Sequence, residues 1–157
     1  ELQDPYGKRF WPKFKGRDGC RTPMPWSADQ TNGGFSDGKP WLPVAVEHIQ
    51  SAAEVQDRDQ NSMLNFYRRL VEFRKSHRAL LKGNFEIVEA DDGYIAFERH
   101  YGNERLFCAF NLSDKARNIA MPDGVWAVDV NSPFNVIASV KVPKLAAWQA
   151  LFATVEE

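Results

Sequence analysis

The sequence has little of several features that would place it in a class at once. Two cysteines, Cys20 and Cys108, are too few for a disulfide scaffold and lack metal-ligand spacing, so we expect two free thiols. Three scattered histidines without a suitably spaced partner predict neither a metal site nor a catalytic imidazole: His48, His77 and His100. No apolar run reaches the ~20 residues that cross a bilayer, and no signal-peptide pattern stands at the start.

Excess charge of either sign is also missing. The net charge is −1 and the isoelectric point is near 6.4, which leaves no basic field for nucleic acid and no polybasic patch for a membrane surface. We therefore expect no nucleic-acid partner and no membrane partner. We also expect no metal and no cofactor. A neutral or polar substrate fits this composition better.

Hydrophobic and aromatic residues are plentiful, at 43% and 13% of 157 residues, which is enough for a real core. Residues 1–45 are rich in Gly, Pro, Trp and Phe without a period of 2 or 3.6, a pattern typical of a long structured loop. Loops of that length in compact proteins are usually functional. Its aromatic side chains need a packing partner, part of which we expect outside this chain: Phe10, Trp11, Phe14, Trp26, Phe35 and Trp41.

Within that loop, residues 16–26 combine two arginines and an aspartate with glycines and prolines that exclude regular structure. We expect Arg17 and Arg21 to be held rigidly, offering planar donors suited to carboxylates and hydroxyls beside the flat face of Trp26. Asp18 is expected to brace the loop by local pairing or by accepting backbone N–H groups. The alternative is a surface loop whose arginines pair with local carboxylates and whose Trp26 lies in the core.

Two helices are predicted in the middle of the chain. Ser51 and Glu54 fit a capping box, which predicts a short helix to about residue 56. Apolar residues at three- and four-residue steps then predict a helix from about residue 63 to His77, capped by Asp59 or Asn61. The paired basic residues interleaved with them are expected on its solvated face: Arg68, Arg69, Arg74 and Lys75.

From Phe85 onwards the pattern has a period of 2 and predicts short strands over residues 85–88, 94–101, 105–111, 117–120, 125–129, 139–142 and 147–154. Gly102-Asn103 is the clearest hairpin turn, because both residues accept positive φ. Strands without crossover helices imply an antiparallel sandwich. Trp126 and Trp148 fall in these strands, where packing in the core or at a domain interface is favoured over a sugar platform.

The run Arg-Asp-Gly-Cys-Arg-Thr-Pro-Met-Pro-Trp at 17–26 closely resembles bacterial α-glucosidases of the α-amylase superfamily (glycoside hydrolase family thirteen), in the oligo-1,6-glucosidase branch. The resemblance extends through residues 2–7, 34–36, 39–44, 64–70 and 107–113. It covers nearly the whole of this chain but only the last part of the family's chain, as if the chain were an excised C-terminal piece.

The resemblance implies an α+β fold in two parts. Residues 1–82 would be the last loop and helix of a (β/α)₈ barrel, and residues 83–157 an antiparallel all-β sandwich domain. The family's nucleophilic aspartate, acid/base glutamate and third aspartate would precede Glu1. Carboxylates in this chain match none of those motifs, namely Asp18, Asp29, Asp37, Asp57 and Asp59. Because a retaining glycosidase needs paired carboxyl groups, we expect no catalytic residue here and an inactive fragment.

Binding roles can be carried over by resemblance. Arg21 matches the arginine that pairs with an aspartate of an early barrel loop and contacts the outer hydroxyls of the non-reducing glucose. Arg17 matches an arginine nearer the pocket mouth, on the leaving side. The implied function is that of an exo-acting α-glucosidase on terminal α-linked glucose of oligosaccharides, with the remainder of the barrel as partner. Two alternatives stay open: a sucrose isomerase or transglucosylase of the same superfamily, and a non-catalytic carbohydrate-binding β-domain.

Overall fold

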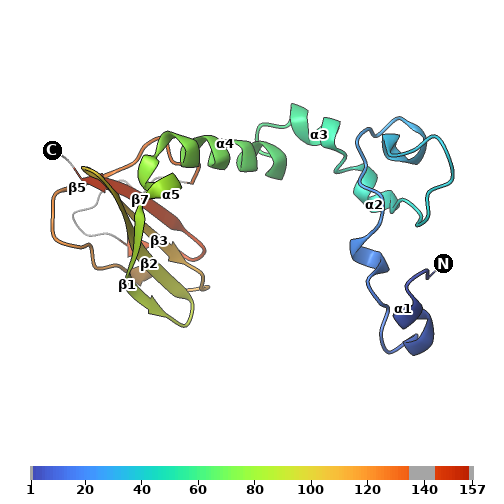
Figure 1. Ribbon diagram of the computed structural model, residues 1–157, viewed down its shortest axis with the longest axis horizontal. Coiled ribbons are helices and arrows are strands. Elements are labelled where there is room, and N and C mark those ends of the chain that lie inside the picture. The colour runs from blue at the N-terminus through green and yellow to red at the C-terminus, as the bar shows by residue number, and fades with distance from the viewer. Residues whose placement is uncertain (1, 135–143, 156–157) are drawn as a thin grey trace. The chain divides into compact units, whose positions relative to one another are not determined.

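The computed structural model describes residues 2–134 and 144–155, and the chain forms two compact units that divide between Tyr67 and Arg68 (Figure 1). Unit 1 comprises residues 1–67 and unit 2 residues 68–157. Unit 2 takes in the long helix from Arg68 onwards as well as the sheet. The predicted domain boundary between residues 82 and 83 stays a prediction.

Unit 1 contains short helices joined by irregular segments: α1 (Pro5–Phe10), η1 (Asp18–Cys20), η2 (Thr31–Gly34), α2 (Val46–Ile49) and α3 (Ala53–Arg58). The prediction of a continuous loop over residues 1–45 is therefore wrong at α1, and the short 3₁₀ helices η1 and η2 also lie within that range. Helix α1 forms because the Asp4 carboxylate accepts the backbone N–H of Tyr6 and Pro5 occupies the first turn. An aspartate at the N-cap followed by proline is a favourable combination for a helix start.

The predicted capping box at Ser51 is also wrong. Helix α3 begins at Ala53, after Ala52, and no side chain caps it. The Glu54 carboxylate instead accepts the hydroxyl of Ser27 at 2.8 Å and the backbone N–H of Ala28 at 2.7 Å. Glu54 thus bonds to Ala28, 26 residues away, and not to the backbone of Ser51 as the capping box predicts.

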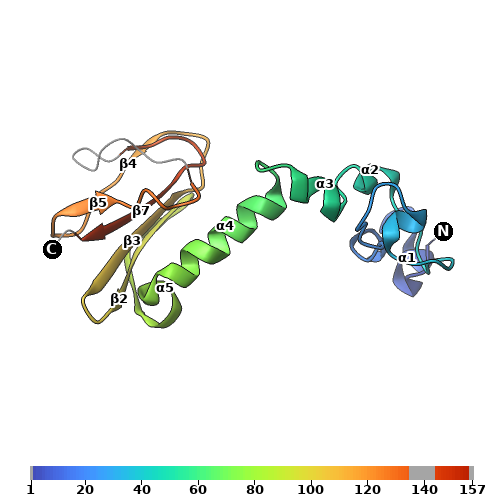
Figure 2. The ribbon, with the colours of Figure 1, turned by 90° about the horizontal axis from the view of Figure 1, so that it is seen from above.

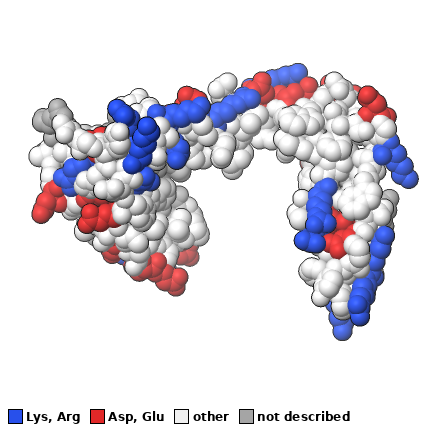
Figure 3. Space-filling view, in the orientation of Figure 1, with Lys and Arg blue, Asp and Glu red and all other residues white. Residues whose placement is uncertain are grey.

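Helix α4 (Met63–Ser76) confirms the long amphipathic helix, with one correction at its start. Neither Asp59 nor Asn61 caps it, because the Ser62 hydroxyl accepts the backbone N–H of Asn65 at 3.2 Å. The Asp59 carboxylate accepts the N–H of Asn61 in the preceding turn. The four basic residues named above are exposed, and Figure 3 shows Lys and Arg along this helix.

The helix stops at His77, whose extended backbone separates it from α5 (Arg78–Lys82). Figures 1 and 2 show α5 beside the sheet of unit 2. The carboxylate of Glu104 accepts the N–H of Ala79 at 2.8 Å, which satisfies one orphan donor at the start of α5.

The main sheet of unit 2 has five antiparallel strands in the order β1-β2-β3-β7-β5. Their bounds are β1 (Asn84–Asp91), β2 (Tyr94–Tyr101), β3 (Glu104–Asn111), β5 (Trp126–Val128) and β7 (Ala150–Val155). A second sheet pairs β4 (Arg117–Asn118) with β6 (Lys144–Leu145). The Gly102-Asn103 hairpin is confirmed, with Gly102 at φ +61°. The predicted strand at 139–142 lies outside the described residues, and a full sandwich stays a prediction.

Each face of the five-stranded sheet carries an apolar cluster. One face carries Phe107, Trp126 and Leu151 against Leu145 of β6. On the other face, Phe73 of α4 and Ala79 of α5 pack with Cys108 and Phe152, and the rings of Phe73 and Phe152 are 5.0 Å apart. The last turns of α4 therefore pack on the sheet through Phe73.

The two tryptophans of this unit differ. Trp126 is buried, as predicted. Trp148 is not in the core: it is 69% exposed and lies before β7 with a positive φ of 60°. Core packing is therefore wrong for Trp148, because β7 starts only at Ala150.

Across the part of the chain that the structure describes, no helix is long and apolar enough to cross a membrane. Among those same residues, no three His, Cys, Asp or Glu side chains gather where they could hold a metal ion. Both cysteines are free thiols, Cys20 exposed and Cys108 buried, as expected.

Candidate functional site

The loop at residues 16–26 is the candidate site, and Asp18 joins it to residues 3 and 4 by hydrogen bonds. The Asp18 carboxylate accepts the backbone N–H of Gln3 at 2.6 Å and that of Asp4 at 3.0 Å. Asp18 is 6% exposed. This confirms the expected bracing role of Asp18 and leaves its carboxylate occupied with backbone donors.

Asp4 returns the contact in the opposite direction. Its carboxylate accepts the backbone N–H of Arg17 at 2.9 Å and lies 3.6 Å from the Arg17 guanidinium. The N–H of Arg17, followed by that of Tyr6, holds the pKa of the Asp4 carboxyl below its usual range. Two segments more than ten residues apart in sequence therefore exchange carboxylate-to-backbone bonds.

Sequence reasoning missed Asp4. The available signal was its position directly before Pro5, which is typical of an N-cap, but nothing local predicts the contact with Arg17. That contact needs Gly16, whose φ is +72°, because a Cβ at this position would lie 2.9 Å from the Asp4 side chain. Glycine lets the two segments approach this closely.

Both predicted arginines lie on this braced backbone with exposed side chains. Arg17 directly precedes η1 and its side chain is 69% exposed. Arg21 directly follows η1, donates its N–H to the carbonyl of Asp18 at 3.0 Å, and is exposed. The arginines are thus fixed at their backbones while their guanidinium groups can reach a ligand.

Trp26 is 55% exposed, so the alternative is wrong in placing Trp26 in the core. Its other part agrees with the structure, since the Asp4 carboxylate lies 3.6 Å from the Arg17 guanidinium. The segment of Trp26 is fixed by the backbone, since the N–H groups of Trp26 and Ser27 both donate to the carbonyl of Gly33, at 2.7 and 3.0 Å. The same unit exposes further rings: Tyr6, Phe10, Trp11, Phe14, Phe35 and Trp41. So many exposed aromatic rings are unusual on a solvent-facing surface and are typical of a surface that contacts other protein or a ligand.

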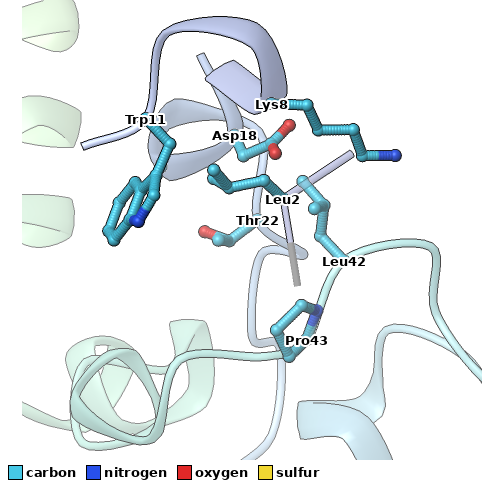
Figure 4. Close-up of a pocket in the computed structure, with 8 residues that line it drawn as sticks. Leu2, Lys8, Trp11, Asp18, Thr22, Leu42 and Pro43 are labelled. Atoms are coloured by element: carbon cyan, nitrogen blue, oxygen red, sulfur yellow. The ribbon is translucent and has the colours of Figure 1, made fainter. Parts of the chain in front are cut away.

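A pocket of about 710 Å³ adjoins the loop (Figure 4). Its lining combines apolar side chains with a few polar groups: Leu2, Lys8, Trp11, Asp18, Gly19, Thr22, Leu42 and Pro43. Neither Arg17 nor Arg21 lines it. The indole of Trp11 offers a flat apolar wall and the hydroxyl of Thr22 a polar group, a combination that small polar ligands use.

Three carboxylates among the described residues of unit 1 are occupied by hydrogen-bond donors. The two that are buried, Asp4 and Asp18, each accept backbone N–H groups. Glu54 is likewise occupied, and the N–H of Ala28, followed by the hydroxyl of Ser27, holds its pKa below the usual range. With their pKa values lowered, Asp4 and Glu54 stay ionised near neutral pH and are unsuited to act as a general acid there.

Comparison with known proteins assigns the chain to a family. The family described as "Alpha amylase, catalytic domain" matches residues 3–83. A probable α-glucosidase of Rhizobium meliloti (strain 1021) is 47% identical over 154 residues, which are 98% of this chain and 28% of the relative. Trehalose-6-phosphate hydrolase of Bacillus subtilis (strain 168) is 38% identical over 121 residues, covering 74% of this chain and 21% of that protein.

Solved structures agree. The crystal structure of an α-glucosyl transfer enzyme matches 99% of this chain and 29% of its own, with 38% identity and a TM-score of 0.85. Isomaltulose synthase from Klebsiella matches 90% of this chain and 26% of its own, with 27% identity and a TM-score of 0.74. The chain thus spans less than a third of the length of these relatives. It belongs to the α-amylase family.

Proposed function

We propose that this chain is the C-terminal part of an exo-acting, retaining α-glucosidase that removes terminal α-linked glucose from oligosaccharides. Residues 1–82 would supply the substrate loop, residues 16–26, and the last helix of the catalytic barrel, while residues 83–157 would form the C-terminal β-domain. The remainder of the barrel would cover the exposed rings of unit 1. The observation that carries the proposal is the braced loop that presents Arg17 and Arg21 outward.

In this proposal Arg21 contacts the outer hydroxyls of the terminal glucose together with an aspartate from the rest of the barrel. An ion pair there closes the pocket behind one sugar, so a longer chain could not extend past it, and cleavage starts from chain ends. Arg17 contacts the leaving sugar or alcohol at the pocket mouth. The exposure of both side chains in this chain supports these roles.

The test is substitution in the longer protein, here called the parent enzyme. Arg21→Ala removes charge-assisted hydrogen bonds of roughly 1.5–3 kcal/mol each, so kcat/KM should fall about tenfold to several hundredfold. Arg21→Lys should not restore it, because an ammonium lacks the planar fork of donors. Arg17→Ala should lower kcat/KM for disaccharides more than kcat/KM for aryl glucosides.

The matched control is Arg58→Ala, since Arg58 is a similarly exposed arginine whose carboxylate contact, to Glu54, is 4.0 Å long. It should leave kcat/KM unchanged. Arg21→Ala with kcat/KM within about twofold of wild type on both substrate types would remove this loop from the glucose pocket.

The 157-residue chain alone should hydrolyse no glucoside, because it lacks the paired carboxylates of a retaining mechanism. Release of p-nitrophenol from its α-glucoside by the purified chain, above a blank without protein, would contradict this. A sucrose isomerase or transglucosylase is the second candidate, supported by the α-glucosyl transfer enzyme and isomaltulose synthase among the similar structures. Product analysis of the parent enzyme with sucrose separates the two, since a hydrolase yields free glucose and fructose while an isomerase yields a new disaccharide.

A further inference from the structure

Asp4 joins the entry of α1 to the loop that carries both arginines. Its side chain is only 4% exposed. One carboxylate oxygen, Oδ1, accepts the N–H of Tyr6 at 2.8 Å. The other, Oδ2, accepts the N–H of Arg17 at 2.9 Å and lies 3.6 Å from Nε of the same residue.

We propose that Asp4 is a positioning residue for the substrate loop, which acts by fixing the backbone and the guanidinium of Arg17 with its ionised carboxylate. The consequence for sugar binding rests on the proposed function above. The consequence for the geometry of Arg17 does not, and it can be measured in this chain directly.

The donors around Asp4 require a carboxylate. Each oxygen faces an N–H group, and Oδ2 faces a cation as well, so both positions must accept. An asparagine has one acceptor oxygen and would turn its NH₂ group toward either the N–H of Tyr6 or that of Arg17. Asp4→Asn therefore keeps the shape of the side chain but leaves one N–H opposed by a donor.

The surrounding backbone shows that the contact is built into the fold. Asp18 accepts the N–H of Asp4 itself, so each aspartate holds the segment that bears the other. The absence of a side chain at Gly16 gives Asp4 room to reach Arg17. Arg17 is thus held through its own amide and through the residue that follows it.

The first experiment is amide hydrogen exchange by NMR on the 157-residue chain, comparing wild type with Asp4→Asn. We expect exchange of the Arg17 amide to accelerate about tenfold or more, as the loss of a bond to a charged acceptor implies. The control is Asp37→Asn, an exposed aspartate of the same unit, which should change nothing at Arg17. An unprotected Arg17 amide in the wild type, or equal exchange in Asp4→Asn, would overturn the proposal.

A second set of amides separates positioning from general folding. The N–H groups of Ala53 and Glu54 donate to the carbonyls of Pro25 and Trp26, elsewhere in unit 1. Their exchange should be unchanged in Asp4→Asn. Acceleration at these amides equal to that at Arg17 would mean that Asp4 supports the whole unit, and would also overturn the proposal.

The parent enzyme supplies the functional readout. Asp4→Asn should raise KM for a disaccharide by about tenfold with little change in kcat, because Arg17 is fully present but no longer oriented. Combined with Arg17→Ala it should add nothing further, whereas independent effects would multiply. If the two substitutions multiply their effects on KM, Asp4 does not act through Arg17 and the proposal is wrong. If the parent enzyme has no glucosidase activity, the proposed function is wrong. The exchange of the Arg17 amide would then still test whether Asp4 positions Arg17.

Discussion

The side chain of Asn111 makes three short buried hydrogen bonds in unit 2, and its removal should destabilise that unit strongly. Asn111 is 1% exposed. Its amide donates to the carbonyls of Lys115 and Ala146, both at 2.7 Å, and its oxygen accepts the hydroxyl of Ser113 at 2.7 Å. One side chain thereby joins the end of β3 to the segment that precedes β7.

The magnitude follows from these three short bonds. At about 1 kcal/mol net each, Asn111→Ala should lower the free energy of unfolding of unit 2 by about 3 kcal/mol. A domain of ordinary stability has about 5–15 kcal/mol in total, so this is a large share. Native-state hydrogen exchange at the amides of β3 measures the loss, since the central strand should open only when the unit unfolds.

Asn111→Asp is the sharper variant. It keeps the acceptor for Ser113 but places a second oxygen against the carbonyls of Lys115 and Ala146, where no donor remains. The charged form is disfavoured there, so the new carboxyl should have a raised pKa in the folded state. The variant should therefore be least stable near neutral pH and recover as the pH falls toward the ordinary aspartate value of about 3.9.

Asn118→Ala, an exposed asparagine in β4, is the matched control and should cost little. A loss below about 1 kcal/mol for Asn111→Ala would refute the reasoning, because it would mean that water or a rearranged loop replaces the three bonds at no cost. Equal stability of Asn111→Asp at neutral and acid pH would refute the claim that the amide of Asn111 is needed as a donor to the carbonyls of Lys115 and Ala146.

Three further predictions concern single groups. The pKa of Glu54 is lowered, so its ionised carboxylate stabilises the fold above the ordinary glutamate range, and this stabilisation is lost as the pH falls through the lowered pKa. At that acid pH the Ala28 amide, which donates to Glu54, should exchange faster than its intrinsic rate and its protection at neutral pH together predict. A thiol reagent should label Cys20 in the native chain and Cys108 only after unfolding, since burial raises the pKa of the Cys108 thiol to about 12. Gly16→Ala should destabilise the loop by more than about 1 kcal/mol, because a Cβ in this left-handed backbone conformation would meet Asp4; an unchanged melting curve would contradict this.

Local sequence determined the elements whose causes are local. The Gly102-Asn103 turn, the flanking strands and the three- to four-residue period of α4 were all predicted at nearly their observed positions. The family could also be predicted, since the run at residues 17–26 is itself the signal. Each of these depends on residues within a few positions of one another, where backbone preference and side-chain period act directly.

Tertiary structure decided the partners of the carboxylates. Glu54 looked like half of a capping box but accepts from Ser27 and Ala28, and Asp4, which sequence reasoning missed, caps α1 and also accepts from Arg17. A carboxylate accepts from whichever N–H groups the folded chain brings to it, and those donors lie 13 and 26 residues away. No local pattern encodes such distances, so the residues that hold the candidate site in place emerge only once the two segments have met.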